Sequence, residues 1–231
     1  MASDLIQISI PDYIAAVGGL GVAAYALVDS SKAIRGGVSN YGFGNIERVL
    51  TNLYPKNTEK NDRSNPLSLA MVMDTLLASW LNGIALADQK AIAKSLVKLR
   101  LDAVNAEHLA KVTGVDAGVL ASVANKIATG ESLTQQEKDV FGRFDLILSA
   151  LLDEGYQRAD QAYRNCAKAW AAAVSVGLAL IGGWVVYSDI FSNSKHFWTA
   201  ILVGLLAVQL APISKDLSSA LAERINGVRF D

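Results

Sequence analysis

The chain is poor in cysteine, proline and net charge, and each shortage excludes a class of protein. One cysteine among 231 residues excludes a scaffold held together by disulfide bonds, and four prolines with eighteen glycines exclude collagen-like and low-complexity chains. Charged residues make up only 19% of the composition, whereas hydrophobic residues make up 52%. This apolar excess excludes intrinsic disorder and indicates either a membrane protein or a large buried core.

A surplus of positive charge is also lacking. The 21 lysines and arginines are matched by 22 aspartates and glutamates, which leaves a net charge of −1. A nucleic-acid-binding protein needs a surplus of cations to neutralise phosphates. We therefore expect no nucleic acid among the partners.

Residue patterns that support catalysis or metal binding are scarce as well. The only two histidines, His108 and His196, lie far apart in the sequence, and Cys166 has no metal-ligand or redox spacing. The glycines of 36–44 match neither of the phosphate-binding loop patterns, GxxxxGK[ST] and GxGxxG. The acidic residues at 153 and 154 are adjacent, so their side chains would point apart on a helix, which is typical of a solvated face. We expect no catalytic residue, no metal site and no cofactor.

Three stretches without any charged residue dominate the hydropathy. They run from Tyr13 to Val28, from Ala169 to Ser188 and from His196 to Ser214, over 16, 20 and 19 residues. A helix that crosses a bilayer needs about 20 mostly apolar residues, and about 17 suffice. The second and third stretches meet this requirement and the first is marginal. We expect all three to be transmembrane helices.

Aromatic residues stand at the ends of these stretches, where tryptophan and tyrosine collect at membrane–water interfaces. Trp170 begins the second stretch, Trp184 and Tyr187 end it, and Phe197 and Trp198 begin the third. Only seven residues, 189–195, separate the two stretches. The pair is therefore expected to form an antiparallel transmembrane hairpin.

The first stretch has an alternative interpretation as a cleaved signal peptide. Such a peptide begins with basic residues, but the first twelve residues contain Asp4 and Asp12 and no lysine or arginine. We expect an uncleaved anchor whose amino end lies outside the cell.

Basic residues that flank the expected spans gather on one side of the membrane. They are Lys32, Arg35, Arg48, Arg158, Arg164, Lys168, Lys215, Arg224 and Arg229, whereas only Lys195 falls on the other side. The positive-inside rule then places residues 30–168 and the carboxyl-terminal tail in the cytoplasm. In the absence of transit or cleavable signals, we expect the cell inner (cytoplasmic) membrane.

A fourth apolar segment, Ser64 to Ala87, contains Asp74 as its only charge. If it crossed the bilayer, Lys90, Lys94 and Lys98 would move outside or the chain ends would be inverted, against the positive-inside rule. A carboxylate at the bilayer midplane is also costly unless it serves a pathway. We expect a core helix of the cytoplasmic domain, and Asp74 would line a pathway only under the four-span alternative.

Residues 30–134 predict a cytoplasmic helical domain. Gly36 to Asn45 is rich in Gly, Ser and Asn and predicts a turn, followed by a short helix from Ile46 to Tyr54. Ser64 or Asn65 before Pro66 predicts the start of a helix that runs to about Leu81.

Further caps divide the rest of this domain. Asp88 predicts the start of an amphipathic surface helix, with Ile92, Leu96, Leu99 and Val104 on one face and Lys90, Lys94 and Lys98 on another. Asn105 and Asp116 predict two short helices that end at Gly114 and Gly130. Thr134 and Glu137 form a capping box that starts the next helix.

One unbroken helix is expected from about Gln135 to Tyr187. It would join a cytoplasmic stalk, 135–168, to the second span, with a length of roughly 80 Å at about 1.5 Å per residue. Residues spaced alternately by three and four along it predict a helix-packing seam: Phe141, Phe144, Leu148, Leu152, Gly155, Ala159, Ala162, Cys166, Ala169, Ala173, Val176, Leu180 and Gly183.

Small residues occupy the part of this seam that enters the membrane, namely Gly155, Ala159, Ala162, Cys166, Ala169 and Ala173. In lipid, small residues let helix backbones approach closely, and this packing drives association. The partner is either another span of the same subunit or a second copy around an axis, and the spacing leaves both open. Cys166 is expected to be a small residue of the seam.

Membrane lipid is the other expected partner. Lys32, Arg35, Arg164, Lys168 and Lys215 are expected at one depth, where anionic headgroups attract cations by about 1 kcal/mol per residue. The same residues also satisfy the positive-inside rule without binding a specific lipid. The amphipathic tail, 215–231, is expected at the interface or docked on the domain.

The resulting expectation is an all-α membrane protein with five parts: an amino-terminal anchor (1–29), a helical domain (30–134), a stalk helix (135–168), a transmembrane hairpin (169–214) and a tail (215–231). The function expected first is a non-enzymatic homo-oligomeric scaffold, anchor or pore. The alternatives are a channel or transporter component that uses Asp74 or the polar span residues Ser175, Thr199 and Gln209, and a membrane-anchored adaptor that binds a cytoplasmic protein partner. A membrane-bound enzyme is disfavoured because no motif supports it.

Overall fold

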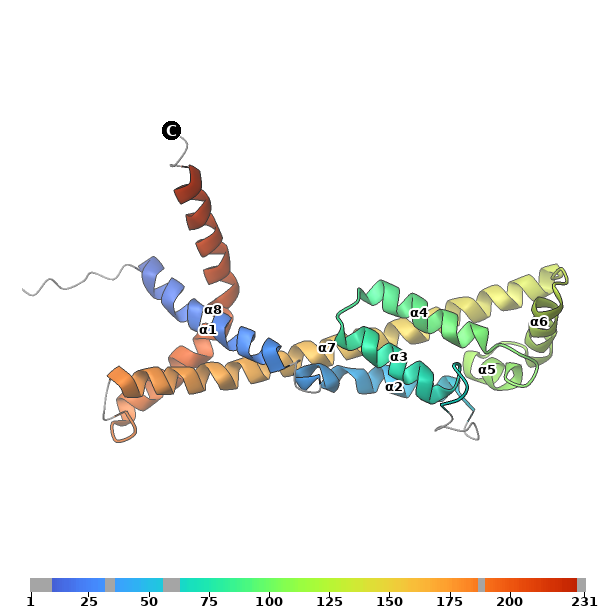
Figure 1. Ribbon diagram of the computed structural model, residues 1–231, viewed down its shortest axis with the longest axis horizontal. Coiled ribbons are helices and arrows are strands. Elements are labelled where there is room, and N and C mark those ends of the chain that lie inside the picture. The colour runs from blue at the N-terminus through green and yellow to red at the C-terminus, as the bar shows by residue number, and fades with distance from the viewer. Residues whose placement is uncertain (1–9, 32–35, 56–62, 187–189, 228–231) are drawn as a thin grey trace, which may run out of the picture. The chain divides into compact units, whose positions relative to one another are not determined.

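The computed structural model describes residues 10–31, 36–55, 63–186 and 190–227, with the backbone alone for 10–12 and 215–227. All regular structure in these residues is helical (Figure 1). The elements are α1 (Ile10–Ser30), a short 3₁₀ turn (Gly37–Ser39), α2 (Asn40–Leu53), α3 (Leu69–Leu81), α4 (Leu86–Leu99), α5 (Ala106–Thr113), α6 (Ala117–Thr129), α7 (Gln135–Val186) and α8 (Ser194–Gly227). The all-α prediction is confirmed.

The chain divides into two compact units. One unit comprises Met1–Val38 and Arg164–Asp231, and we call it the membrane unit after the transmembrane helices that the sequence predicts in it; the helical unit comprises Ser39–Tyr163. The predicted helix from 135 is confirmed, because α7 runs without a break for 52 residues and belongs to both units. Its first part is not a separate stalk, however, since residues 135–163 are an integral part of the helical unit.

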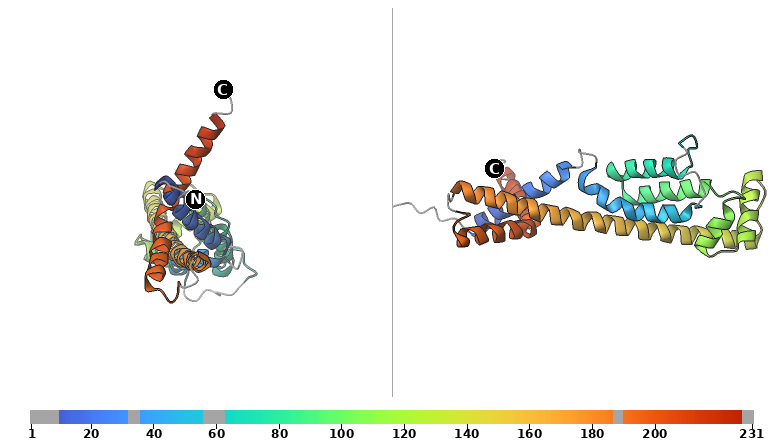
Figure 2. Two further views of the ribbon diagram at one scale, coloured as in Figure 1. Left: turned by 90° about the vertical axis from the view of Figure 1, so that its left-hand side faces the viewer. Right: turned by 90° about the horizontal axis from the view of Figure 1, so that it is seen from below.

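The core of the helical unit forms where α2 to α5 pack on the first half of α7 (Figure 2). Phe144, Leu148, Leu152, Tyr156 and Ala159 of α7 are almost fully buried in it. Four of these five residues belong to the predicted seam. The large end of that seam is therefore a packing surface within one chain, and the burial of Tyr156 raises the pKa of its phenol.

Helix α2 begins six residues earlier than the sequence predicts and includes most of the glycine-rich segment. The reason is the close approach of α2 to α7 at Gly42, where an added Cβ would lie 2.5 Å from the carbonyl oxygen of Ala159. The Trp80 indole closes the same contact, because its Nε1 donates a hydrogen bond of 2.8 Å to the carbonyl of Ser39 and its ring meets Tyr163 edge-on. The glycines of this segment therefore serve packing as well as turning.

Two predicted helix starts are wrong. Helix α3 is capped by Ser68, whose hydroxyl accepts from the Met71 amide, whereas Asn65 caps a turn before it by accepting from Leu67. Helix α4 begins at Leu86, so Asp88 lies within its first turn, where its negative charge favours the helix dipole.

The caps predicted further along are mostly confirmed. The carboxylate of Asp116 accepts from the Val119 amide, and α5 and α6 end at left-handed Gly114 and Gly130. Asn105 stands before α5 without capping it through its side chain, because that side chain bonds to Asp102 instead.

Helix α4 does not present its lysines to solvent as the sequence predicts. Its buried face is Gln89, Ala93 and Val97, while Leu99 and Val104 are exposed. The three lysines are partly buried and pair with carboxylates of α7: Lys90 with Asp153, and Lys94 and Lys98 with Asp145 at 2.6 and 3.0 Å.

The acidic pair at 153–154 lies on a partly exposed face, as the sequence predicts, and Asp153 also has a lysine partner on α4. Burial by itself raises the pKa of the Asp145 carboxyl. The hydrogen bonds and positive charges of Lys94 and Lys98 lower this pKa by more, so it lies below its ordinary value.

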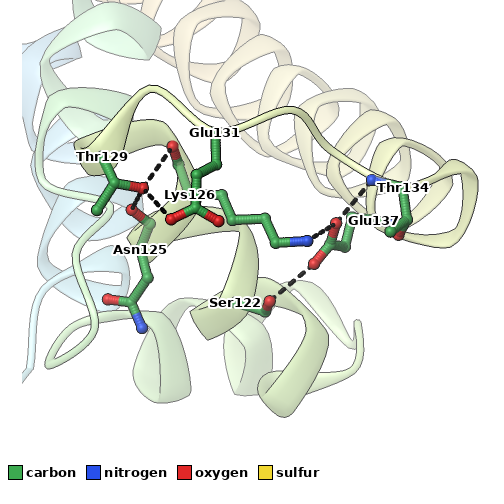
Figure 3. Close-up of polar contacts among 7 residues, drawn as sticks. All are labelled: Ser122, Asn125, Lys126, Thr129, Glu131, Thr134 and Glu137. Carbon is green, nitrogen blue, oxygen red and sulfur yellow. Dashed lines mark hydrogen bonds and ion pairs between the residues drawn. The ribbon is translucent and has the colours of Figure 1, made fainter.

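The start of α7 is fixed by the predicted capping box (Figure 3). The Glu137 carboxylate accepts from the Thr134 amide at 2.7 Å, and the Glu137 amide donates to the Thr134 hydroxyl at 3.3 Å. Lys126 and Ser122 of α6 also donate to Glu137, at 2.9 and 2.7 Å. Led by Lys126, these donors lower the pKa of Glu137 from 4.5 to about 2.

Because this pKa is lowered in the folded state, charged Glu137 stabilises the fold above pH 4.5, and the contribution disappears as the pH falls from 4.5 to about 2. We expect Glu137→Gln to lower the melting temperature by a few degrees at pH 7 and to lose this effect over that pH range. Circular dichroism of the detergent-solubilised chain measures both. The control is Glu131→Gln, which alters an exposed carboxylate of the same connection. A melting-temperature difference for Glu137→Gln that stays constant from pH 7 to pH 2.5 would contradict the assignment.

Candidate membrane-spanning helices and their contacts

Three helices are long and apolar enough to cross a membrane, as the sequence predicts. They are Tyr13–Ser30 of α1, the apolar end of α7, and Ser194–Ser214 of α8. Only 22%, 11% and 33% of their most apolar windows are buried. Such a large exposed apolar surface is unfavourable in water and compatible with a lipid environment.

The tryptophans of these helices are about half exposed. Trp170 and Trp184 of α7 lie 14 residues apart, or about 21 Å along the helix, and Trp198 lies in the first turns of α8. The exposed rings at these positions fit the predicted placement at the two interfaces of a bilayer.

Helix α8 continues through Pro212 to Gly227, so no break separates the predicted third span from the predicted amphipathic tail. Proline is tolerated inside membrane helices when neighbouring groups compensate for the lost backbone hydrogen bond. Two residues after Pro212, the hydroxyl of Ser214 donates a hydrogen bond of 3.3 Å to the Ala15 carbonyl of α1.

The tightest contact in the membrane unit joins α1 and α8. An added Cβ at Gly21 would lie 2.0 Å from the carbonyl oxygen of Ala207, and one at Gly18 would overlap the side chain of Ser214. The backbones therefore touch at positions where only glycine fits, which is how helices associate in lipid.

The sequence contains a signal for this packing that hydropathy alone does not reveal. On α8, Gly204, Ala207, Ala211 and Ser214 recur at steps of three, four and three, and all four are buried. That is the spacing of a packing stripe of small residues. The uniform hydropathy of the span concealed the stripe, because polarity does not distinguish its faces.

Helices α7 and α8 also approach closely. An added Cβ at Gly204 of α8 would lie 2.5 Å from the Cα of Val176, and one at Gly183 of α7 would overlap Ile190. Ser175, the neighbour of Val176, is fully buried and its hydroxyl has no hydrogen-bond partner in the described part of the chain. Of the other polar span residues, Thr199 donates to the Lys195 carbonyl and Gln209 is exposed.

The predicted small-residue seam has two different environments. Gly155 and Ala159 are buried in the helical unit, where an added Cβ at Gly155 would lie 2.9 Å from the side chain of Val49. Ala162 and Cys166 are half-buried, and Ala169 and Ala173 are exposed. The first part of the seam therefore packs within the chain, and the last part has no neighbour among the described residues that covers it.

The basic residues predicted to contact headgroups are only partly described. Arg164 and Lys168 are exposed on α7. Lys32 and Arg35 lie outside the described residues, as does the side chain of Lys215. Their convergence at one depth stays a prediction.

Asp74 lies on α3 in the helical unit, outside the three candidate spans. Its side chain is 52% exposed and forms an ion pair of 3.2 Å with Arg63. Helix α3 has 13 residues, which is too short to cross a bilayer, in agreement with the predicted core helix.

A cleft of about 170 Å³ opens in the helical unit between α2, α5 and α7. Its floor is apolar, with Val49, Leu53 and Leu151, and its rim carries Arg48 and Arg158. Arg158 pairs with Glu154 one turn earlier on α7 at 2.7 Å. The cleft thus has the shape for one apolar side chain and basic groups beside it.

The parts of the chain that the structure describes contain no cluster of residues that could bind a metal ion. No three histidine, cysteine or carboxylate side chains there could hold an ion together. His108 lies on α5, where its Nε2 is 3.0 Å from the Asn52 carbonyl, and His196 lies on α8 in the other unit.

The α1–α8 contact allows a matched test. We expect Gly21→Ala to force the two backbones apart and to lower the melting temperature of the detergent-solubilised protein by several degrees, because overpacking costs roughly 1–3 kcal/mol. Gly19→Ala is the control, because an added Cβ there meets nothing within 4 Å. Tryptophan fluorescence follows the transition. Equal melting temperatures for the two variants would show that the backbones are not in contact at Gly21.

When the chain is compared with protein-family models, with curated proteins and with solved structures, it matches none of them.

Proposed function

We propose that this chain is a non-enzymatic integral protein of the cytoplasmic membrane, which anchors the helical unit at the inner surface and assembles with copies of itself as a scaffold. The observation that carries the proposal is that α7 is one helix with two kinds of surface. Its first half closes a core with ion pairs around it, and its second half is apolar and exposed.

The distribution of charge supports the orientation. Between Lys168 and Lys215 the only basic side chains are Lys195 and His196, beside the start of α8, whereas basic residues are frequent on the opposite side of the spans. By the positive-inside rule, the helical unit and the carboxyl terminus are cytoplasmic and the amino terminus is outside.

Exposed small residues on α7 support self-association. Ala169 and Ala173 lie on one face of the helix with half-buried Cys166, and the apolar window of α7 is the least buried of the three. In lipid, such a face allows a second helix to approach closely. Gly155 and Ala159 do not belong to this interface, because they already pack within the helical unit.

Topology is tested by cysteine labelling in a Cys166→Ala background. We expect Lys195→Cys to react with a membrane-impermeant maleimide in intact cells and Glu131→Cys to react only after permeabilisation, because the two positions lie on opposite sides. The protein should also remain in the membrane after carbonate extraction. Labelling of Glu131→Cys from outside would reverse the orientation, and extraction by carbonate would exclude the integral membrane protein.

Self-association is tested through the native Cys166, the only cysteine. We expect a short bismaleimide to cross-link pairs of chains in membranes, and Ala169→Leu with Ala173→Leu to reduce the yield at least fivefold, because the larger side chains separate the helices. Ala167→Leu is the matched control, since it points about 100° away from Cys166 at the same depth. Full labelling of Cys166 without cross-linking, or cross-linking that the double variant leaves unchanged, would contradict the proposed assembly.

The cleft between α2, α5 and α7 favours a second candidate function, a membrane-anchored adaptor. Its apolar floor and the basic rim of Arg48 and Arg158 suit an apolar side chain next to an acidic residue of a cytoplasmic protein partner. Loss of a co-purifying partner in Arg48→Gln, with cross-linking at Cys166 unchanged, would favour this candidate over the scaffold.

A further inference from the structure

A second hollow lies within the membrane unit, between α1, α7 and α8, and has a volume of about 430 Å³. We propose that this groove binds one acyl chain of an anionic phospholipid, whose headgroup lies at Lys195 and His196. The inference rests on the proposed membrane location and adds a specific lipid site on the outer side, opposite the basic residues of the inner surface.

Small residues create the space. The groove is lined by Ala16 of α1, by Ala179 and Gly182 of α7, and by Ala200 of α8, with larger apolar neighbours between them. An added Cβ at Gly182 would meet nothing within 4 Å, so the backbone of α7 faces open space there. The close approach of Gly204 of α8 to the backbone of Val176 fixes α8 on α7 beside it, so the helices cannot simply close the groove.

The groove lies in one half of the proposed bilayer. Its lining comes from the first half of α1, from the last turns of α7 and from the first turns of α8. In the proposed topology these three segments share the outer leaflet. A lipid of that leaflet can therefore enter laterally with its chain among apolar side chains.

The size of the groove favours a chain over a helix. One turn of a helix, about 10 Å across with side chains and about 5.4 Å long, already occupies roughly 420 Å³. Even when its open mouth is counted, the groove holds no more than about two turns of a spanning helix from a second copy. A flexible acyl chain can fill the same volume along its length.

Charge at one end of the groove favours an anionic headgroup. His196 lines the groove, and Lys195 precedes it and is exposed. Thr199, one turn further along α8, also lines the groove, and its hydroxyl donates to the Lys195 carbonyl at 2.8 Å. The cation thus stands where α8 begins, at the expected level of phosphate groups.

The test is native mass spectrometry of the full chain, purified in mild detergent and mixed with equal amounts of dioleoylphosphatidylglycerol and dioleoylphosphatidylcholine. We expect one retained phosphatidylglycerol per chain. Gly182→Leu should reduce this adduct at least fivefold by filling the groove, and Ala179→Leu should do the same from the next turn. Lys195→Gln should keep one adduct but lose the preference for phosphatidylglycerol.

Gly177→Leu is the matched control, because Gly177 is another α7 glycine whose added Cβ would meet nothing within 4 Å and it does not line the groove. It should retain the lipid as the wild type does. Three results would each overturn the site. The lipid adduct could be lost equally in Gly177→Leu, or it could be retained in both Gly182→Leu and Ala179→Leu. In the third, Gly182→Leu would lose self-association and keep the lipid. A chain that resists carbonate extraction but retains no lipid overturns the site alone, whereas a chain extracted by carbonate overturns the proposed function.

Discussion

The structure depends on the backbone hydrogen bonds of α7, which are satisfied within the helix over 52 residues. A helix needs no outside partner for its backbone, so the same element can cross from an aqueous environment into lipid without a loop between them. No proline occurs along this stretch to remove a donor. What changes along α7 is the side chains alone: charged and large apolar residues in the helical unit, and uncharged, mostly apolar residues of mixed size beyond Lys168.

Glycine has the same role in both units, which is to let helix backbones touch. Gly42 meets the carbonyl of Ala159 in the helical unit, and Gly21 meets that of Ala207 in the membrane unit. The driving forces differ. A helix contact in water is reinforced by the burial of apolar neighbours, whereas a helix contact in lipid relies on van der Waals packing and on hydrogen bonds of the kind that Ser214 donates to Ala15.

Local signals in the sequence predicted the fold well where they were self-contained. The capping box at Thr134 and Glu137, the cap at Asp116 and the uncharged runs each depend on neighbours in the chain, and each is found in the structure. The wrong predictions concern side chains whose surroundings are determined by residues far away in the sequence. The lysines of α4 were assigned to solvent because their partners lie about 50 to 60 residues away on α7.

The candidate site was harder to predict for the same reason. Spacing identified the small residues of α7 but not their neighbours, and it missed the stripe on α8 because every face of that span is apolar. The groove was beyond prediction, because it exists only where three helices that are distant in sequence leave a space between small residues.

The geometry of α7 explains why one seam has two environments. At about 100° per residue, Ala162, Cys166, Ala169 and Ala173 continue the face that Phe144, Leu148 and Gly155 bury in the helical unit. Within the membrane unit, Ala171 and Ser175 of α7 are fully buried, and at about 100° per residue Ala173 points about 160° away from Ala171. The face of Ala169 and Ala173 is exposed where the candidate span begins. Rotating α7 to bring this face toward α1 and α8 would remove Ala171 and Ser175 from their contacts with those helices. Only a further element can cover that face, and in a bilayer the choice is between lipid and another helix of matching small residues.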